Sequence, residues 1–134
     1  MLEKVVVGID GSDASEAVAQ WCRKALSGSE AQVVAVSCHT YRPELGDAAN
    51  GQLRAELAIG TAGFCKLLSD TGIGCTSRVV DGDPRVALQE VAADEEADML
   101  VVGSRGRSQL SDLMLGSVAS YLTHHSPVSI LVVR

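Results

Sequence analysis

The segment from Gly103 to Ser117 has the residue types and spacing of an anion-binding loop. It reads GSRGRSQLSDLMLGS, so that Gly103 and Gly106 are followed, after nine further residues, by Gly116 and Ser117. Glycines let a backbone approach a ligand without interference from a Cβ atom. The last glycine precedes an expected helix, whose first N–H groups and positive dipole end favour a phosphate. The segment therefore predicts a phosphate site.

Charged and hydroxyl side chains lie between these glycines. Arg105 and Arg107 carry cationic donors, and Ser104 and Ser108 carry hydroxyl groups that can assist phosphate binding. The alternative interpretation is an ordinary glycine-rich turn. Because glycine is only 13 of 134 residues, glycines and a hydroxyl at this spacing seldom arise by chance.

The sequence contains no established catalytic motif. It has no G-x-S-x-G elbow, no H-E-x-x-H pair and no P-loop lysine. His39 has no evident orienting partner in the sequence, and His124 and His125 are expected to end a helix. A phosphate loop without a general base predicts binding without efficient hydrolysis, although slow hydrolysis stays open.

The composition restricts the ligand. Phe64, Trp21, Tyr41 and Tyr121 are the whole set of aromatic residues, and 17 acidic against 11 basic residues give a net charge of −6. Nucleic acid needs basic grooves and stacking platforms, so no nucleic-acid partner is expected. A flavin held between aromatic rings is excluded because the chain has too few aromatic residues. Backbone, aliphatic and small polar groups must bind the ligand.

The expected compartment is the cytoplasm. The first segment, MLEKVVVGID, has charges within its apolar run and no cleavage site, so it does not resemble a signal peptide. No apolar run approaches the roughly 18 residues of a membrane span, so no membrane partner is expected. Cys22, Cys38, Cys65 and Cys75 lack C-x-x-C spacing and fall in apolar segments. They are expected to be inert core thiols rather than a disulfide or metal ligands.

Apolar runs alternate with amphipathic helices along a chain of 134 residues, which suits one domain over 1–134. Strands are expected at 5–9, 32–38, 74–80, 99–102 and 128–133, of which 74–80 is polar enough for an edge strand. Helices are expected over 13–26, 53–68, 84–92 and around 118–122, and 39–50 is interpreted as a flexible connection. This order predicts a doubly wound α/β fold with a five-stranded parallel sheet and helices on both faces.

Several segments resemble the universal stress protein family. The spacing of Gly103, Gly106, Gly116 and Ser117 matches its ATP-binding signature, G-2x-G-9x-G-[S/T]. The other similar segments are VVVGIDGSDAS, the DGDP before the third helix, ADMLVVGSRGR and HHSPVSILVV, the last with Ser129 where a second proline is common. The likeness covers nearly the whole chain. It implies the strand order 3-2-1-4-5 and a cytoplasmic, ATP-binding regulatory protein of the stress response.

The resemblance also assigns roles to residues near the strand ends. Asp10 would contact the nucleoside, since a carboxylate suits ribose hydroxyls and Asp13 and Ser12 are better placed to cap the first helix. Gly8 would allow close approach of adenine, and the backbone at Cys38 would pair with the adenine edge. The full cofactor-binding set is Gly8, Ile9, Asp10, Cys38, Gly103, Ser104, Arg105, Gly106, Ser108, Gly116, Ser117 and Val118. Mg2+ is expected with ATP, held mainly by phosphates and water.

Two other interpretations stay open. One is a family member that binds no nucleotide and acts only on protein partners, which the sequence does not identify. The other is a signalling receiver or a flavodoxin-like carrier on the same architecture. A receiver would use Asp81 as phosphoacceptor, but Asp10 alone makes a poor acidic pair and no lysine follows the last strand. A flavodoxin would need aromatic partners for the flavin.

A homodimer through residues 128–134 is the expected assembly. The last strand is a flat aliphatic edge, which proteins in water usually cover. The resemblance implies that this strand pairs with its two-fold mate.

Overall fold

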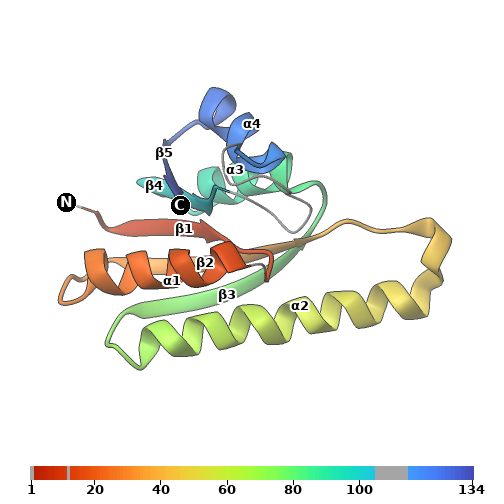
Figure 1. The fold of residues 1–134 in the computed structure, drawn as a ribbon, viewed down its shortest axis with the longest axis horizontal. Coiled ribbons are helices and arrows are strands. Elements are labelled where there is room, and N and C mark those ends of the chain that lie inside the picture. The colour runs from red at the N-terminus through yellow and green to blue at the C-terminus, as the bar shows by residue number, and fades with distance from the viewer. Residues whose placement is uncertain (1, 12, 105–114) are drawn as a thin grey trace.

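Five parallel strands form the central sheet. The computed structural model describes residues 2–11, 13–104 and 115–134. The strands are β1 (Lys4–Gly8), β2 (Gln32–His39), β3 (Gly74–Asp81), β4 (Met99–Gly103) and β5 (Ser129–Val133). They pair in parallel in the order β3-β2-β1-β4-β5, with β3 and β5 at the edges (Figure 1). The predicted fold class and strand order are confirmed.

Helices cover both faces of this sheet. They are α1 (Asp13–Leu26), α2 (Gly46–Ser69), α3 (Pro84–Asp94) and α4 (Ser117–His125), and a short 3-10 helix, η1 (Pro43–Leu45), precedes α2. Helices α1 and α2 pack on one face, and α3 and α4 on the other. Asp83 caps α3 by accepting a hydrogen bond from the Arg85 amide, and Pro84 occupies the first turn.

The central strand β1 is buried on both faces. Val5 and Val7 belong to the apolar cluster under α1 and α2, and Val6 belongs to the cluster under α3 and α4. All three side chains have no exposed surface. Since successive side chains of a strand point to opposite faces, a strand covered on both sides needs a continuous apolar run. This requirement is why the apolar run over 5–9 predicted a strand of a parallel sheet.

The sheet opens at the carboxyl ends of β1 and β4. Pairing of β1 with β2 ends at Gly8 and Val36, and its pairing with β4 ends at Val7 and Val101. The chain leaves β1 toward α1 on one face, whereas α4, which follows β4 in the chain, lies on the other face. A ligand crevice lies at such a point in doubly wound sheets. Both segments that the sequence singled out follow these two strands.

The prediction of a flexible connection over 39–50 is wrong. His39 is the last, buried residue of β2, and the segment then forms η1 and the first turn of α2. Asn50 holds this arrangement together: its side chain accepts from the Arg42 amide at 2.8 Å and donates to the carbonyls of Arg42 and Gly46 at 2.7 Å. Polar turn-forming residues here start a helix because one buried amide satisfies three backbone groups.

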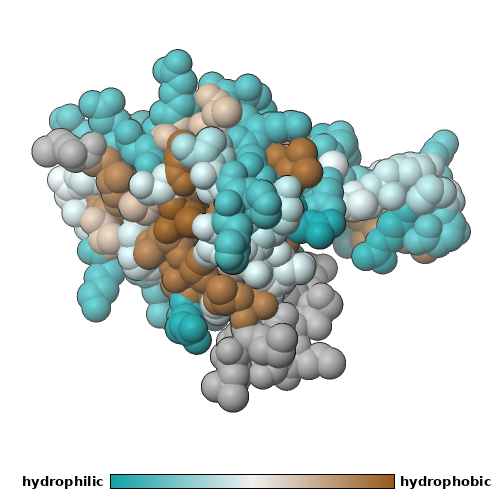
Figure 2. Space-filling view, turned by 90° about the horizontal axis from the view of Figure 1, so that it is seen from above, coloured by the Kyte–Doolittle hydropathy of each residue, from teal (hydrophilic) through white to brown (hydrophobic). Residues whose placement is uncertain are grey.

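Helix α2 therefore extends well beyond the sheet. It is 24 residues long, and its first half projects past the strand ends together with η1 (Figure 1). Figure 2 shows this projecting end as a mainly hydrophilic lobe. Within the described residues, no helix is both long enough and apolar enough to cross a membrane.

The prediction for the four cysteines is correct for one pair and wrong for the other. Cys22 is a free, buried core thiol, and Cys38 is free and half-buried. Cys65 of α2 and Cys75 of β3 form a disulfide, with their Cα atoms 5.2 Å apart. The turn after α2 folds β3 back along the helix, so that residues ten positions apart become neighbours. The disulfide ties α2 to the edge strand.

Candidate functional site

A cavity of about 620 Å3 opens at the carboxyl end of the sheet. Its walls come from the ends of β1, β2 and β4 and from the first turns of α1, α3 and α4. Helix α2 closes one side through residues from Leu53 to Phe64. Ligand pockets are usually concave spaces of about 300–1,000 Å3, so this volume suits a small organic ligand.

The cavity brings together most of the residues predicted to bind a cofactor. Those that line it are Gly8, Ile9, Asp10, Cys38, Gly103, Gly116, Ser117 and Val118. Ser104 is different: it is 6% exposed and does not line the cavity. Arg105, Gly106 and Ser108 lie outside the described residues.

The start of α4 presents backbone donors to the cavity. Gly116 is the N-cap residue and supplies no side-chain cap. None of the described residues accepts a hydrogen bond from the amides of Ser117, Val118 and Ala119. All three residues line the cavity. Amide donors at the positive end of a helix favour an anionic group.

The Gly116 amide has a structural role instead. It donates to the Ser104 carbonyl at 2.6 Å, and the Ser104 amide donates to the Val133 carbonyl at 2.7 Å. These bonds fasten the start of α4 to the ends of β4 and β5. The donors available to an anion therefore begin one residue later than the glycine of the predicted loop.

The edge of β2 beyond Val36 borders the cavity. The register of β1 ends at Gly8 opposite Val36, so no β1 residue lies opposite Ser37 or Cys38. The backbone at Cys38 is thus on an edge that β1 leaves unpaired. Burial, and secondarily the charge of Asp83, raises the pKa of the Cys38 thiol to about 12. The thiol stays protonated at neutral pH, so a reactive thiolate is not expected here.

Comparison with known proteins places the chain in a family. Residues 1–134 match the model of the Universal stress protein family. The chain belongs to the universal stress protein family. Universal stress protein Rv1636 of Mycobacterium tuberculosis (strain ATCC 25618 / H37Rv) is 31% identical over 141 residues, covering 97% of this chain and 94% of that protein.

Solved structures agree with this assignment. A universal stress protein crystallised in complex with cAMP is 27% identical, with a TM-score of 0.77 over 99% of this chain and 97% of that one. Universal stress protein UspA from Lactobacillus plantarum is 22% identical, with a TM-score of 0.84 over 99% and 98% of the two chains, which shows the shared fold. Membership of the universal stress protein family favours that interpretation over the receiver and flavodoxin alternatives.

Gly8 lies against core side chains in this universal stress protein fold. A Cβ atom on Gly8 would lie 2.8 Å from Cδ1 of Leu88 and 3.3 Å from Cγ1 of Val102. A side chain at Gly8 would therefore force Leu88 of α3 and Val102 of β4 to shift, so packing of the core also favours glycine here. The predicted role of Gly8 in admitting adenine stays a prediction.

Helix α2 contributes a wall of the cavity that was not predicted from the sequence. This wall consists of Leu53, Glu56, Leu57, Gly60, Thr61 and Phe64. The apolar pattern of the leucines and Phe64 predicted a helix but not its place beside the ligand crevice. Phe64 is 6% exposed, belongs to the core cluster and lines the cavity.

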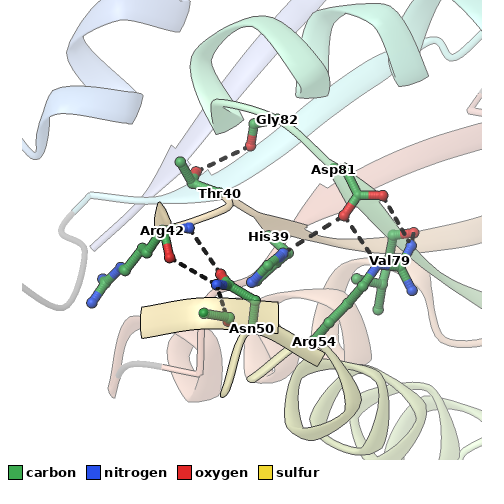
Figure 3. Close-up of polar contacts among 9 residues, drawn as sticks. His39, Thr40, Arg42, Asn50, Arg54, Val79, Asp81 and Gly82 are labelled. Carbon is green, nitrogen blue, oxygen red and sulfur yellow. Dashed lines mark hydrogen bonds and ion pairs between the residues drawn. The ribbon is translucent and has the colours of Figure 1, made fainter. Parts of the chain in front are cut away.

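Polar contacts fix the rim of this cavity beside β2 (Figure 3). Arg54 of α2 bonds to Asp81 at the end of β3, with Nε 3.0 Å from Oδ1, and to the Val79 carbonyl at 3.1 Å. The Arg54 hydrogen bond and charge, helped by His39, hold the pKa of the Asp81 carboxyl below its usual range. Oδ1 of Asp81 also lies 3.6 Å from Nδ1 of His39. Helix α2, β2 and β3 thus meet at one ionic cluster.

The described residues bring together no group of three or more His, Cys, Asp or Glu side chains that could hold a metal ion. Any divalent ion at this site would depend on ligand oxygens and water for most of its coordination.

Proposed function

We propose that this universal stress protein is a cytoplasmic regulatory protein of the stress response that binds ATP, with Mg2+, in the cavity at the carboxyl end of the sheet. One observation carries the proposal. The amides of Ser117, Val118 and Ala119 have no acceptor among the described residues, and all three line a cavity that Asp10 also lines. Helix-start amides suit phosphates, and a carboxylate suits ribose hydroxyls.

The remainder of the cavity fits the rest of a nucleotide. The unpaired edge of β2 at Cys38 and the apolar walls from Val18, Leu57 and Phe64 suit a planar base. The related universal stress protein at 27% identity was crystallised with cAMP, which also carries adenine, ribose and phosphate. Gly103 would lie beside the phosphates, and Mg2+ would be held mainly by their oxygens and by water.

The proposed output is a change in protein partners rather than a reaction. The sequence carries no established motif for ATP hydrolysis, so efficient hydrolysis is not expected. ATP-bound and empty forms would instead differ in their affinity for partners.

Isothermal titration of the purified, nucleotide-free chain with ATP and Mg2+ tests the proposal. We expect saturable binding at one site per chain, and mass spectrometry should find an adenine nucleotide that survives gentle purification. If no binding occurs at millimolar ATP, the proposal is wrong. The chain would then fit the alternative of a family member that acts on protein partners without a nucleotide.

We also propose a homodimer through residues 128–134. Strand β5 is an edge strand whose residues Ile130 to Val133 are only half-buried, and Figure 2 shows apolar surface on the side of the molecule where β5 lies. An uncovered aliphatic edge favours pairing with a second copy. Sedimentation at micromolar concentration should give twice the 14.0 kDa chain mass. A monomer throughout that range would contradict the dimer.

A further inference from the structure

His39 carries a buried nitrogen without a partner. The side chain is 8% exposed, and the residue lines the cavity at the end of β2. Its Nε2 atom is buried and has no hydrogen-bond partner among the described residues. A buried polar atom left without a partner is unfavourable, because it has given up its hydrogen bonds to water. An atom of a ligand, or an ordered water, is therefore expected beside Nε2.

The carboxylate of Asp81 favours the tautomer of neutral His39 that carries its proton on Nδ1. Its Oδ1 lies 3.6 Å from Nδ1, and Arg54 keeps this carboxyl ionised (Figure 3). An ionised carboxylate only accepts hydrogen bonds, so the neutral imidazole places its proton on Nδ1. Nε2 is then an acceptor.

Ser37, two residues earlier on the same face of β2, is also an acceptor toward the cavity. Thr61 uses its single hydroxyl proton on the Leu57 carbonyl, at 2.6 Å. Because Ser37 Oγ lies 2.6 Å from Thr61 Oγ1, the Ser37 hydroxyl must donate to Thr61. The proton of Ser37 is thus used inside the protein, and only its lone pairs remain for a ligand. Ser37, His39 and Thr61 all line the cavity.

Nε2 of His39 and Oγ of Ser37 therefore favour a ligand group that only donates hydrogen bonds. We propose that Nε2 of His39 accepts a hydrogen bond from the 6-amino group of adenine and thereby selects 6-amino purines over 6-oxo purines. The inference rests on the proposed nucleotide binding and adds a residue that reads the base. The 6-oxo group of hypoxanthine or guanine has only lone pairs, which would face the lone pair of Nε2. The adjoining edge of β2, unpaired by β1, is where a planar base could lie.

The test compares ATP with ITP, which carries a 6-oxo group in place of the 6-amino group. In calorimetric titrations of the wild-type chain, we expect ATP to bind about tenfold more tightly or better. In His39→Phe, which keeps a ring but loses the acceptor, ATP affinity should fall about tenfold and the ATP-to-ITP ratio should fall to within about twofold. His124→Phe is the matched control, because His124 is exposed on α4 and lines no part of the cavity. Its ratio should equal that of the wild type.

A wild-type ratio near one, or an unchanged ratio in His39→Phe, would overturn the inference while leaving nucleotide binding intact. Failure of the wild type to bind either nucleotide would overturn the proposed function instead, and this inference with it. If His39→Phe does not fold, imidazole 15N spectra of the wild type decide. An unprotonated Nε2 whose resonance moves with ATP but not with ITP supports the inference, and any other pattern overturns it.

Discussion

Replacing Ser117 with proline is expected to weaken ATP binding by about tenfold or more while α4 stays folded. Ser117 is the first residue of α4, where proline is well tolerated because its missing amide has no partner within the helix. The preceding residue, Gly116, is extended, with φ −64° and ψ 163°, as a residue before proline should be. The substitution deletes one donor that faces the cavity. A hydrogen bond to a charged group contributes about 1.5–3 kcal/mol.

Titration calorimetry with ATP measures the effect, and circular dichroism confirms that the helix is retained. Ser117→Ala is the matched control, because it removes the hydroxyl and keeps the amide. Its ATP affinity should stay much closer to that of the wild type than the affinity of Ser117→Pro. Equal affinities in Ser117→Pro and the wild type would show that the phosphates do not lie at the start of α4.

Leu68→Ala is expected to lower the free energy of unfolding by about 3 kcal/mol, because truncating a buried leucine to alanine typically costs about 2–5 kcal/mol. Leu68 has no exposed surface and belongs to the cluster under α1 and α2. Its carbonyl also accepts from the amides of Thr71 and Ile73, which shape the turn into β3. Leu68 does not line the cavity, so ATP affinity well below the melting temperature should change less than twofold.

Urea unfolding, at one fixed protein concentration because a dimer would make stability concentration-dependent, measures this loss. The neighbouring Leu67 is 50% exposed and provides the control. Leu67→Ala should cost less than about 1 kcal/mol. A similar loss for both variants would mean that α2 does not pack on the sheet through Leu68.

The sheet could be predicted because its central strands have a distinctive local sequence. Val5 to Val7 form a continuous β-branched run that only a strand covered on both faces requires, and Asp83 with Pro84 marks the start of α3 locally. The loops after β1 and β4 followed from the doubly wound order. Local pattern and global fold agree at these positions.

The start of α2, over residues 46–52, could not be predicted, for a physical reason. Apart from Ala49 and Asn50 these residues are exposed, so no apolar stripe marks them as a helix, and their polar, turn-forming character suggested a loop. The disulfide was missed because Cys65 and Cys75 meet only after the chain turns back on itself. The orphan nitrogen of His39 depends on how β2 meets α2, which no spacing in the sequence encodes.

The projecting first half of α2 is expected to open locally more readily than the rest of the helix. A helix of 24 residues is about 36 Å long, against roughly 27 Å for the eight residues of β2. Apart from Asn50, its buried residues lie between Thr61 and Leu68, so the turns before Thr61 have little of the core to hold them. Their amide hydrogens should exchange with deuterium well before those of the last two turns. Since Leu53, Glu56 and Leu57 border the cavity, a molecule seated there would slow that exchange, making the ligand part of what keeps this half of the helix wound.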